Sequence, residues 1–235
     1  MPKRYAAEAV GTFIIVFAPV ALSATGNVSL AIAACVSGLA VLAAIYALGP
    51  ISAAHFNPAV TLAFATAKRF PWRFVLPYIV SQLTGAILAA AFTGLLFGFG
   101  HGVHVPANPE LLLRNLGTEV ALSFILMLVI ASVATDRRVS GTVPAIAIGL
   151  TVVFNVLIGG PITGGSMNPA RSLAPALFAG GPALANLWLY LVAPCIGATL
   201  GALTVEALRI EHEYAKGAPN ELLSALEEVA QEATQ

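Results

Sequence analysis

Charged side chains are scarce in this chain of 235 residues: Asp, Glu, Lys and Arg make up only 9% of it, whereas hydrophobic residues make up 58%. A water-soluble domain of this length needs far more charge to cover its surface. The composition therefore predicts a protein that crosses a membrane several times. The formal net charge is zero, and a chain without an excess of basic residues is not expected to bind nucleic acid.

The sequence also has little of the chemistry on which enzymes and metalloproteins depend. Its two cysteines, Cys35 and Cys195, fall inside apolar stretches, so we expect small core residues rather than a zinc site or a disulfide. The sequence around Ser166 lacks the nucleophile-elbow pattern, and neither a phosphate-binding glycine loop nor a paired metal motif occurs. We therefore expect no enzyme, no cofactor and no metal ion.

Long apolar segments, by contrast, are abundant. Six of them are long enough to cross the ~30 Å core of a bilayer, at residues 6–24, 30–48, 72–97, 116–134, 143–158 and 184–208. Two shorter apolar pieces, 57–67 and 168–179, reach only about halfway across at a rise of ~1.5 Å per residue. The predicted fold is an all-α membrane protein with six transmembrane helices and two re-entrant half-helices.

The chain repeats itself. Asn57-Pro58-Ala59 recurs 111 residues later at Asn168-Pro169-Ala170, and the same offset relates Glu8 to Glu119. We therefore divide the chain into a first repeat (1–110), a second repeat (111–210) and a cytoplasmic tail (211–235). Three spans per repeat is an odd number, so the second repeat is expected to enter the membrane inverted. Inverted repeats place their functional site near the midplane, where discontinuous helices meet.

Basic residues predict the orientation. They lie almost entirely in the terminal and even-numbered connections, at Lys3, Arg4, Lys68, Arg69, Arg73, Arg137, Arg138, Arg209 and Lys216, with Arg114 alone on the other side. By the positive-inside rule both termini lie in the cytoplasm, and we expect the inner (plasma) membrane of a bacterium. The Glu-rich tail predicts a short amphipathic helix from near Asn220 that is solvated or loosely docked.

Asn-Pro-Ala is a compact way to begin a helix, because Asn is a favoured N-cap and Pro suits the first helical position. The two half-helices enter from opposite faces, so their positive dipole ends converge at Asn57 and Asn168. Arg171 adds a full positive charge. This arrangement repels cations and protons but lets a neutral hydroxylated molecule exchange water for the Asn amides and for carbonyls of the loops at 51–56 and 161–167. The pore-lining loop residues are predicted to include His55, Phe56, Gly164, Ser166 and Met167.

Two carboxylates, Glu8 and Glu119, lie at matching places within the spans. An intramembrane carboxylate can act as a proton relay, but the symmetry favours a structural role in which each accepts hydrogen bonds from the amides of a re-entrant loop. His55 is expected to face the pore or brace its loop rather than bind a metal. His101 and His104, in the long external connection, are expected to be solvated.

Three stretches, 7–13, 52–61 and 164–172, resemble the aquaporin, or major intrinsic protein, superfamily, and the resemblance extends over about residues 5–210. The last stretch, together with residues 61–65, looks most like the nodulin-like plant branch and its bacterial relatives. The resemblance implies a homotetramer with one pore per subunit. It also implies a narrow filter outward of the paired Asn, whose four positions carry over by spacing to Ser37, Val156, Gly165 and Arg171.

Water-selective members of that superfamily place Phe and His at the first two filter positions, and glycerol channels place an aromatic pair at the first and third. This chain has neither aromatic, so the filter should be wide. Small filter residues resemble those of nodulin-like channels for boric, silicic and arsenous acid, which stay uncharged near neutral pH and avoid the desolvation cost of an ion. Alternatively, a neighbouring side chain such as Phe56, or a rotated helix, refills the gap.

These observations together predict a passive channel for small uncharged hydroxylated solutes. Metalloid acids are the preferred cargo, with glycerol, urea and water also permeant. An ordinary glycerol and water facilitator is the alternative. A junction protein that uses the same fold would need a blocked pore, against which the small filter residues argue.

Overall fold

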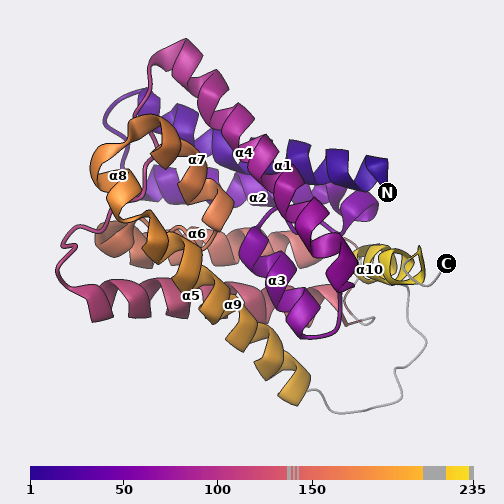
Figure 1. Cartoon of the computed structure of the whole chain (residues 1–235). Coiled ribbons are helices and arrows are strands. Elements are labelled where there is room, and N and C mark those ends of the chain that lie inside the picture. The colour runs from indigo at the N-terminus through magenta and orange to yellow at the C-terminus, as the bar shows by residue number, and fades with distance from the viewer. Residues whose placement is uncertain (137–138, 140, 142, 209–220, 233–235) are drawn as a thin grey trace.

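The computed structural model describes residues 1–136, 139, 141, 143–208 and 221–232, which form a helical bundle (Figure 1). The six long helices are α1 (Pro2–Ala24), α2 (Leu30–Ser52), α4 (Val75–Phe97), α5 (Leu112–Ala134), α6 (Val143–Thr163) and α9 (Leu187–Leu208). All six are long and apolar enough to cross a membrane, α4 together with the 3₁₀ turn η1 (Trp72–Phe74) that precedes it. The shorter helices are α3 (Pro58–Thr66), α7 (Pro169–Ala179), α8 (Gly181–Ala185) and α10 (Glu221–Glu232). The predicted fold, with six spans and two half-helices, is confirmed.

Several helices are longer than predicted. The starts of α1 and α5 lie four residues before the expected 6 and 116, because hydropathy marks only the lipid-embedded part of a helix. At the other end, α2 and α6 run through Pro50 and Pro161. A proline in the last turn removes only one hydrogen bond, so it does not stop the helix there. The non-helical loops are consequently 53–57 and 164–168 rather than 51–56 and 161–167.

Glycines allow the long helices to cross at very short distances. A Cβ atom added to Gly85 of α4 would lie 2.0 Å from the carbonyl oxygen of Ala9 in α1, and one added to Gly197 of α9 would lie 2.1 Å from that of Val120 in α5. The two crossings correspond in the internal repeat. Such close approach is the usual role of small residues in membrane helix packing, so α1–α4 and α5–α9 form matching pairs.

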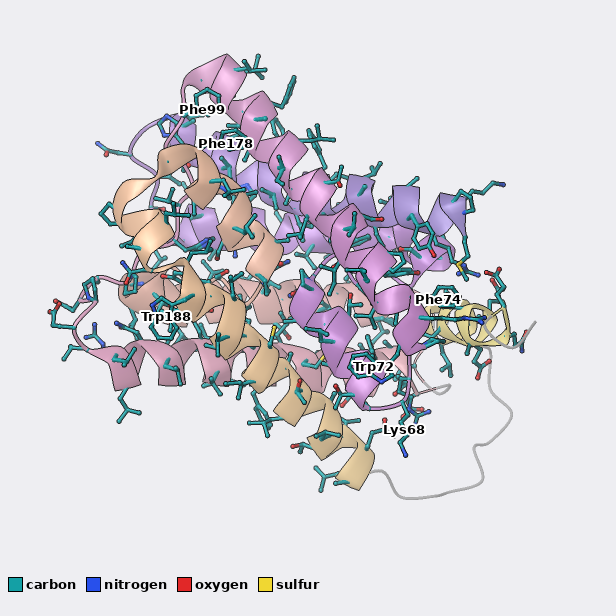
Figure 2. All side chains as sticks on the ribbon, viewed as in Figure 1. Lys68, Trp72, Phe74, Phe99, Phe178 and Trp188 are labelled. Carbon is teal, nitrogen blue, oxygen red and sulfur yellow. The ribbon has the colours of Figure 1, made fainter. Side chains whose placement is uncertain are left out.

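Aromatic side chains mark the two ends of the bundle. Trp72 and Phe74 lie near one end, whereas Trp188, Phe99 and Phe178 lie toward the other (Figure 2). Trp72 and Trp188 are exposed, as befits indole rings at membrane–water interfaces. Lys68 shares the end of Trp72 (Figure 2). Four of the basic residues used to predict the orientation, Arg137, Arg138, Arg209 and Lys216, lie outside the described residues.

The tail helix α10 is docked rather than solvated or loosely held. Its apolar face is buried, with Val229 fully inaccessible and Leu226 only 4% exposed, and it packs against α2. Arg4, at the start of α1, reaches Glu228 at 3.1 Å and Glu232 at 3.5 Å. The helical spacing of the apolar residues predicted the helix, but the partner that holds it lies more than 200 residues away in the chain.

The prediction that both cysteines are core residues is wrong for Cys35. Its side chain is exposed on α2, while that of Cys195 is partly buried. An exposed position on a spanning helix faces lipid or another subunit instead of water, so an apolar sequence context does not imply a place in the core.

Candidate solute channel

The two half-helices meet tip to tip inside the bundle, entering from opposite ends (Figure 1). Asn57 caps α3 by accepting from the amide of Ala59 at 2.9 Å. Asn168 caps α7 by accepting from the amides of Ala170 and Arg171 at 3.0 and 3.3 Å. Both Asn residues are nearly buried. Each Asn side chain therefore accepts hydrogen bonds from the first-turn amides of its helix, which are shielded from water.

The side-chain amides of these Asn residues also tie the two tips together. Nδ2 of Asn57 donates to the carbonyl of Met167 at 2.8 Å, and Nδ2 of Asn168 donates to that of Phe56 at 3.0 Å. The sequence predicted amides free to bind a passing solute. The structure shows that one hydrogen of each NH₂ group is used between the tips, which leaves the second hydrogen for a solute.

The hydrogen bonds between the two tips depend on two residues with a left-handed backbone conformation. Phe56 and Met167 have positive φ angles of 47° and 56°, a region that costs a residue with a side chain about 1–3 kcal/mol. Both residues directly precede a capping Asn and offer their carbonyls to the opposite tip. The surrounding hydrogen bonds must therefore hold the two turns in place.

Glu8 supplies those bonds for the first turn. Its carboxylate accepts from the amides of His55 at 3.0 Å and Phe56 at 2.7 Å. It also accepts from the hydroxyl of Ser52 and the amide of Gln82, each at 2.7 Å. Glu8 is fully buried, so all four donors point at a group that water does not solvate.

Glu119 does the same for the second turn. It accepts from the amides of Ser166 and Met167, each at 2.9 Å, and from the hydroxyl of Thr163 at 2.7 Å. Within the described residues, no side-chain amide donates to Glu119 as Gln82 does to Glu8. Glu119 thus satisfies the buried amides of the second loop, as expected of a carboxylate that holds a loop in place.

A narrow cavity, part of it open to solvent, runs along the two tips. Its polar lining residues are Ser37, His55, Asn57, Ser166, Asn168 and Arg171. Its aliphatic lining residues from the long helices are Ile15, Val41, Ile45, Leu126, Ile130, Ile148 and Val152. Phe56 and Met167 also line it. A solute in this cavity therefore meets a few hydrogen-bonding groups within a largely aliphatic lining.

The four residues assigned to the filter lie together. Nη2 of Arg171 is 3.1 Å from Oγ of Ser37, and its Nη1 donates to the carbonyls of Gly165 at 3.1 Å and Ser166 at 3.4 Å. A Cβ atom on Gly165 would meet Cα of Val156 at 3.3 Å. Val156 and Gly165 are not among the residues that line the cavity. The geometry thus brings the four positions together, with Ser37 and Arg171 at the cavity surface.

The side chain considered as a replacement for the missing aromatics, Phe56, has its ring against α1. A Cβ atom on Gly11 would be only 2.1 Å from its Cε1 atom. Its amide is held by Glu8. Gly11 therefore makes room for the ring beside the first turn.

Two loop histidines, His55 and His104, are buried. His55 braces its loop, since its Nδ1 is 3.1 Å from the hydroxyl of Thr61. His104 was expected to be solvated, and this is wrong. It is only 7% exposed, its Nδ1 lies 3.2 Å from the hydroxyl of Ser172, and its Cδ2 packs against Gly164. A loop position gives no sequence signal for such burial.

Across the described residues, no three His, Cys, Asp or Glu side chains converge as metal ligands.

Comparison with known proteins agrees with this geometry. A model of the major intrinsic protein family matches residues 1–205. The chain belongs to the major intrinsic protein family. Aquaporin NIP1-1 of rice is 43% identical over 219 residues, which cover 90% of this chain and 76% of the relative. Nodulin-26 of soybean is 43% identical over 213 residues, which cover 88% and 78%.

The fold of this family member matches a solved structure as well. The aquaglyceroporin of Plasmodium falciparum superimposes with a TM-score of 0.79 at 24% identity, over 88% of this chain and 96% of that one. The family consists of membrane channels that pass water and small neutral solutes. This chain is accordingly a multi-pass membrane channel and not an enzyme.

Proposed function

We propose that this aquaporin-family channel passively conducts small uncharged hydroxylated solutes, with a preference for arsenous, boric and silicic acid. Glycerol, urea and water are lesser cargo. The observation that carries the proposal is the absence of an aromatic side chain from the four filter positions. Ser37 and Gly165 are small, and Arg171 donates hydrogen bonds to the hydroxyl of the first and the carbonyl of the second.

The largely aliphatic lining of the cavity, with its few polar groups, supports the exclusion of ions. A neutral solute with several hydroxyls exchanges water for the second hydrogens of Asn57 and Asn168 and for loop carbonyls, each of which has two lone pairs. An ion loses its hydration shell against the aliphatic residues without compensation. The convergent ends of α3 and α7 and the charge of Arg171 oppose a cation further.

Within this proposal the remaining site residues hold the pore in shape. Glu8 and Glu119 fix the two left-handed turns, and His55 braces the first loop through Thr61. Gly164 has a φ of 89°, a conformation that favours glycine. Gly164 allows the backbone to turn sharply at the end of α6 and to lead toward Arg171.

Assembly and placement in the cell complete the proposal. We infer a homotetramer with one pore per subunit, and both termini in the cytoplasm, on the side of Arg4, Lys68, Arg69 and Arg73. A bacterial plasma membrane is the predicted location. The relatives described above are plant proteins, so they do not support a bacterial host.

Stopped-flow measurements on proteoliposomes test the function. Boric or arsenous acid should cross faster than through empty vesicles, and faster relative to glycerol than in a channel with an aromatic filter. If glycerol and water cross but boric and arsenous acid move no faster than through bare lipid, the chain is an ordinary glycerol and water facilitator. No flux of any solute would indicate an adhesion role.

A further inference from the structure

His104 occupies a place in the second half of the channel that corresponds to that of His55 in the first. The ring of His55 lies 5.2 Å from that of Tyr78, and its Nδ1 is 3.1 Å from the hydroxyl of Thr61. The ring of His104 lies 5.7 Å from that of Tyr190, and its Nδ1 is 3.2 Å from the hydroxyl of Ser172. Thr61 and Ser172 are separated by the repeat offset of 111 residues.

The two histidines, however, come from different parts of the chain. The offset relates His55 to Ser166, not to His104. His104 belongs to the connection between α4 and α5, most of which is exposed. The two tyrosines do correspond, because each donates its hydroxyl to the last carbonyl of the preceding span, Tyr78 to Ser52 at 3.0 Å and Tyr190 to Thr163 at 2.6 Å. A ring from the external connection thus fills the site that the small Ser166 leaves open.

Through this site the external connection reaches the pore. The hydroxyl of Ser172 lies 2.5 Å from that of Ser166, which donates to the carbonyl of Asn168 at 3.0 Å. The carbonyl of Ser166 accepts from Arg171 at 3.4 Å. A second bond, from the amide of Ala107 to the carbonyl of Ile162 at 2.9 Å, fastens the same connection to the end of α6.

We infer that His104 is a positioning residue for the filter: it holds the 164–168 loop, and through it Arg171 and Asn168, at the separation that sets solute selectivity. The inference rests on the proposed role of Arg171. A neutral ring suits this role, since a second cation next to Arg171 would oppose it. Burial and the nearby charge of Arg171 hold the pKa of His104 well below its usual value of 6.5, so the ring stays neutral at physiological pH.

Three substitutions test the inference. His104→Phe fills the same space but lacks the hydrogen bond, whereas His104→Asn places a polar atom close to the position of Nδ1. Ser172→Ala removes the receiving hydroxyl and leaves the ring intact. The matched control is His101→Ala, because His101 lies in the same connection, half-buried in a separate external pocket with Phe99 and Phe178.

The measured quantity is the ratio of glycerol to water permeability in proteoliposomes, which does not depend on the amount of protein incorporated. The loss of one buried hydrogen bond corresponds to roughly a twofold to tenfold effect. We therefore expect the ratio to change by that factor in His104→Phe and Ser172→Ala, and to stay close to the unmodified value in His104→Asn and His101→Ala. The double variant His104→Phe/Ser172→Ala should change the ratio no more than either single one.

An unchanged ratio in Ser172→Ala, or equal changes in Ser172→Ala and His101→Ala, would overturn the inference. Where His104→Phe does not fold, an unchanged ratio in Ser172→Ala still overturns the inference, because this variant removes the bonds of the hydroxyl to both His104 and Ser166. If the unmodified protein conducts neither glycerol nor boric acid, the proposed function fails instead. The two failures are therefore distinguishable.

Discussion

Replacing Asn57 with Asp should convert the channel into one that leaks cations. The side chain keeps its size and its acceptor for the amide of Ala59. It loses the NH₂ group that bonds to the carbonyl of Met167 at 2.8 Å, and it places a negative charge where the positive ends of α3 and α7 converge. The barrier to cations is the property that should change most.

The magnitude follows from the geometry of the two tips. Each helix terminus carries the equivalent of about +0.5 charge. Two such termini at about 4 Å raise the energy of a monovalent cation by about 4 kcal/mol at an effective dielectric constant near 20. One ionised carboxylate at that distance cancels this contribution. Since about 1.4 kcal/mol corresponds to a factor of ten, cation permeation should rise by up to about a thousandfold.

Conductance across planar bilayers, together with proton flux into dye-loaded vesicles, measures the effect. The leak of Asn57→Asp should increase as the pH rises, because the new carboxyl group carries its charge only when deprotonated. Asn57→Ser is the control, since it keeps a neutral cap acceptor and also lacks the NH₂ group. The reasoning is refuted if Asn57→Asp still conducts water yet excludes ions as well as the unmodified protein does, or if Asn57→Ser leaks equally.

Three further predictions concern the filter, the loop braces and the helix crossings. Ser37→Phe should slow boric acid and glycerol by roughly tenfold or more in stopped-flow assays while slowing water less; an equal loss for all three would show that the filter is misplaced. Glu119→Ala leaves two buried loop amides unpaired and should lower the free energy of unfolding by about 2–6 kcal/mol, seen as an earlier thermal transition in detergent; an unshifted transition would contradict the bracing role. Gly85→Ala places a Cβ atom 2.0 Å from a carbonyl of α1 and should impair folding in the same assay, whereas Gly117→Ala, with open space around it, should not.

Sequence reasoning succeeded where a feature depends on local chemistry or on counting residues. The two half-helices follow from apolar stretches too short to span a bilayer. Their starts follow from Asn and Pro at the first positions, and the structure shows both Asn side chains as caps. The carboxylate contacts were also anticipated, because buried loop amides need acceptors and Glu8 and Glu119 occur once in each repeat.

Sequence reasoning failed where a feature depends on contacts between distant segments. The docking of α10 depends on Arg4, at the opposite end of the chain. The burial of His104 depends on the space beside Ser166 and Tyr190, which the sequence of the connection does not reveal. The use of the Asn amides between the tips depends on the positive φ angles of Phe56 and Met167, and neither residue type favours that conformation.

The most direct test records neutral flux and electrical current from the same reconstituted protein. Boric acid uptake should exceed that of empty vesicles, while the conductance of bilayers made from the same preparation stays at that of bare lipid. Sizeable ionic current through the intact protein would contradict the account, because two facing helix ends that attract neutral hydroxyls should not admit a bare cation.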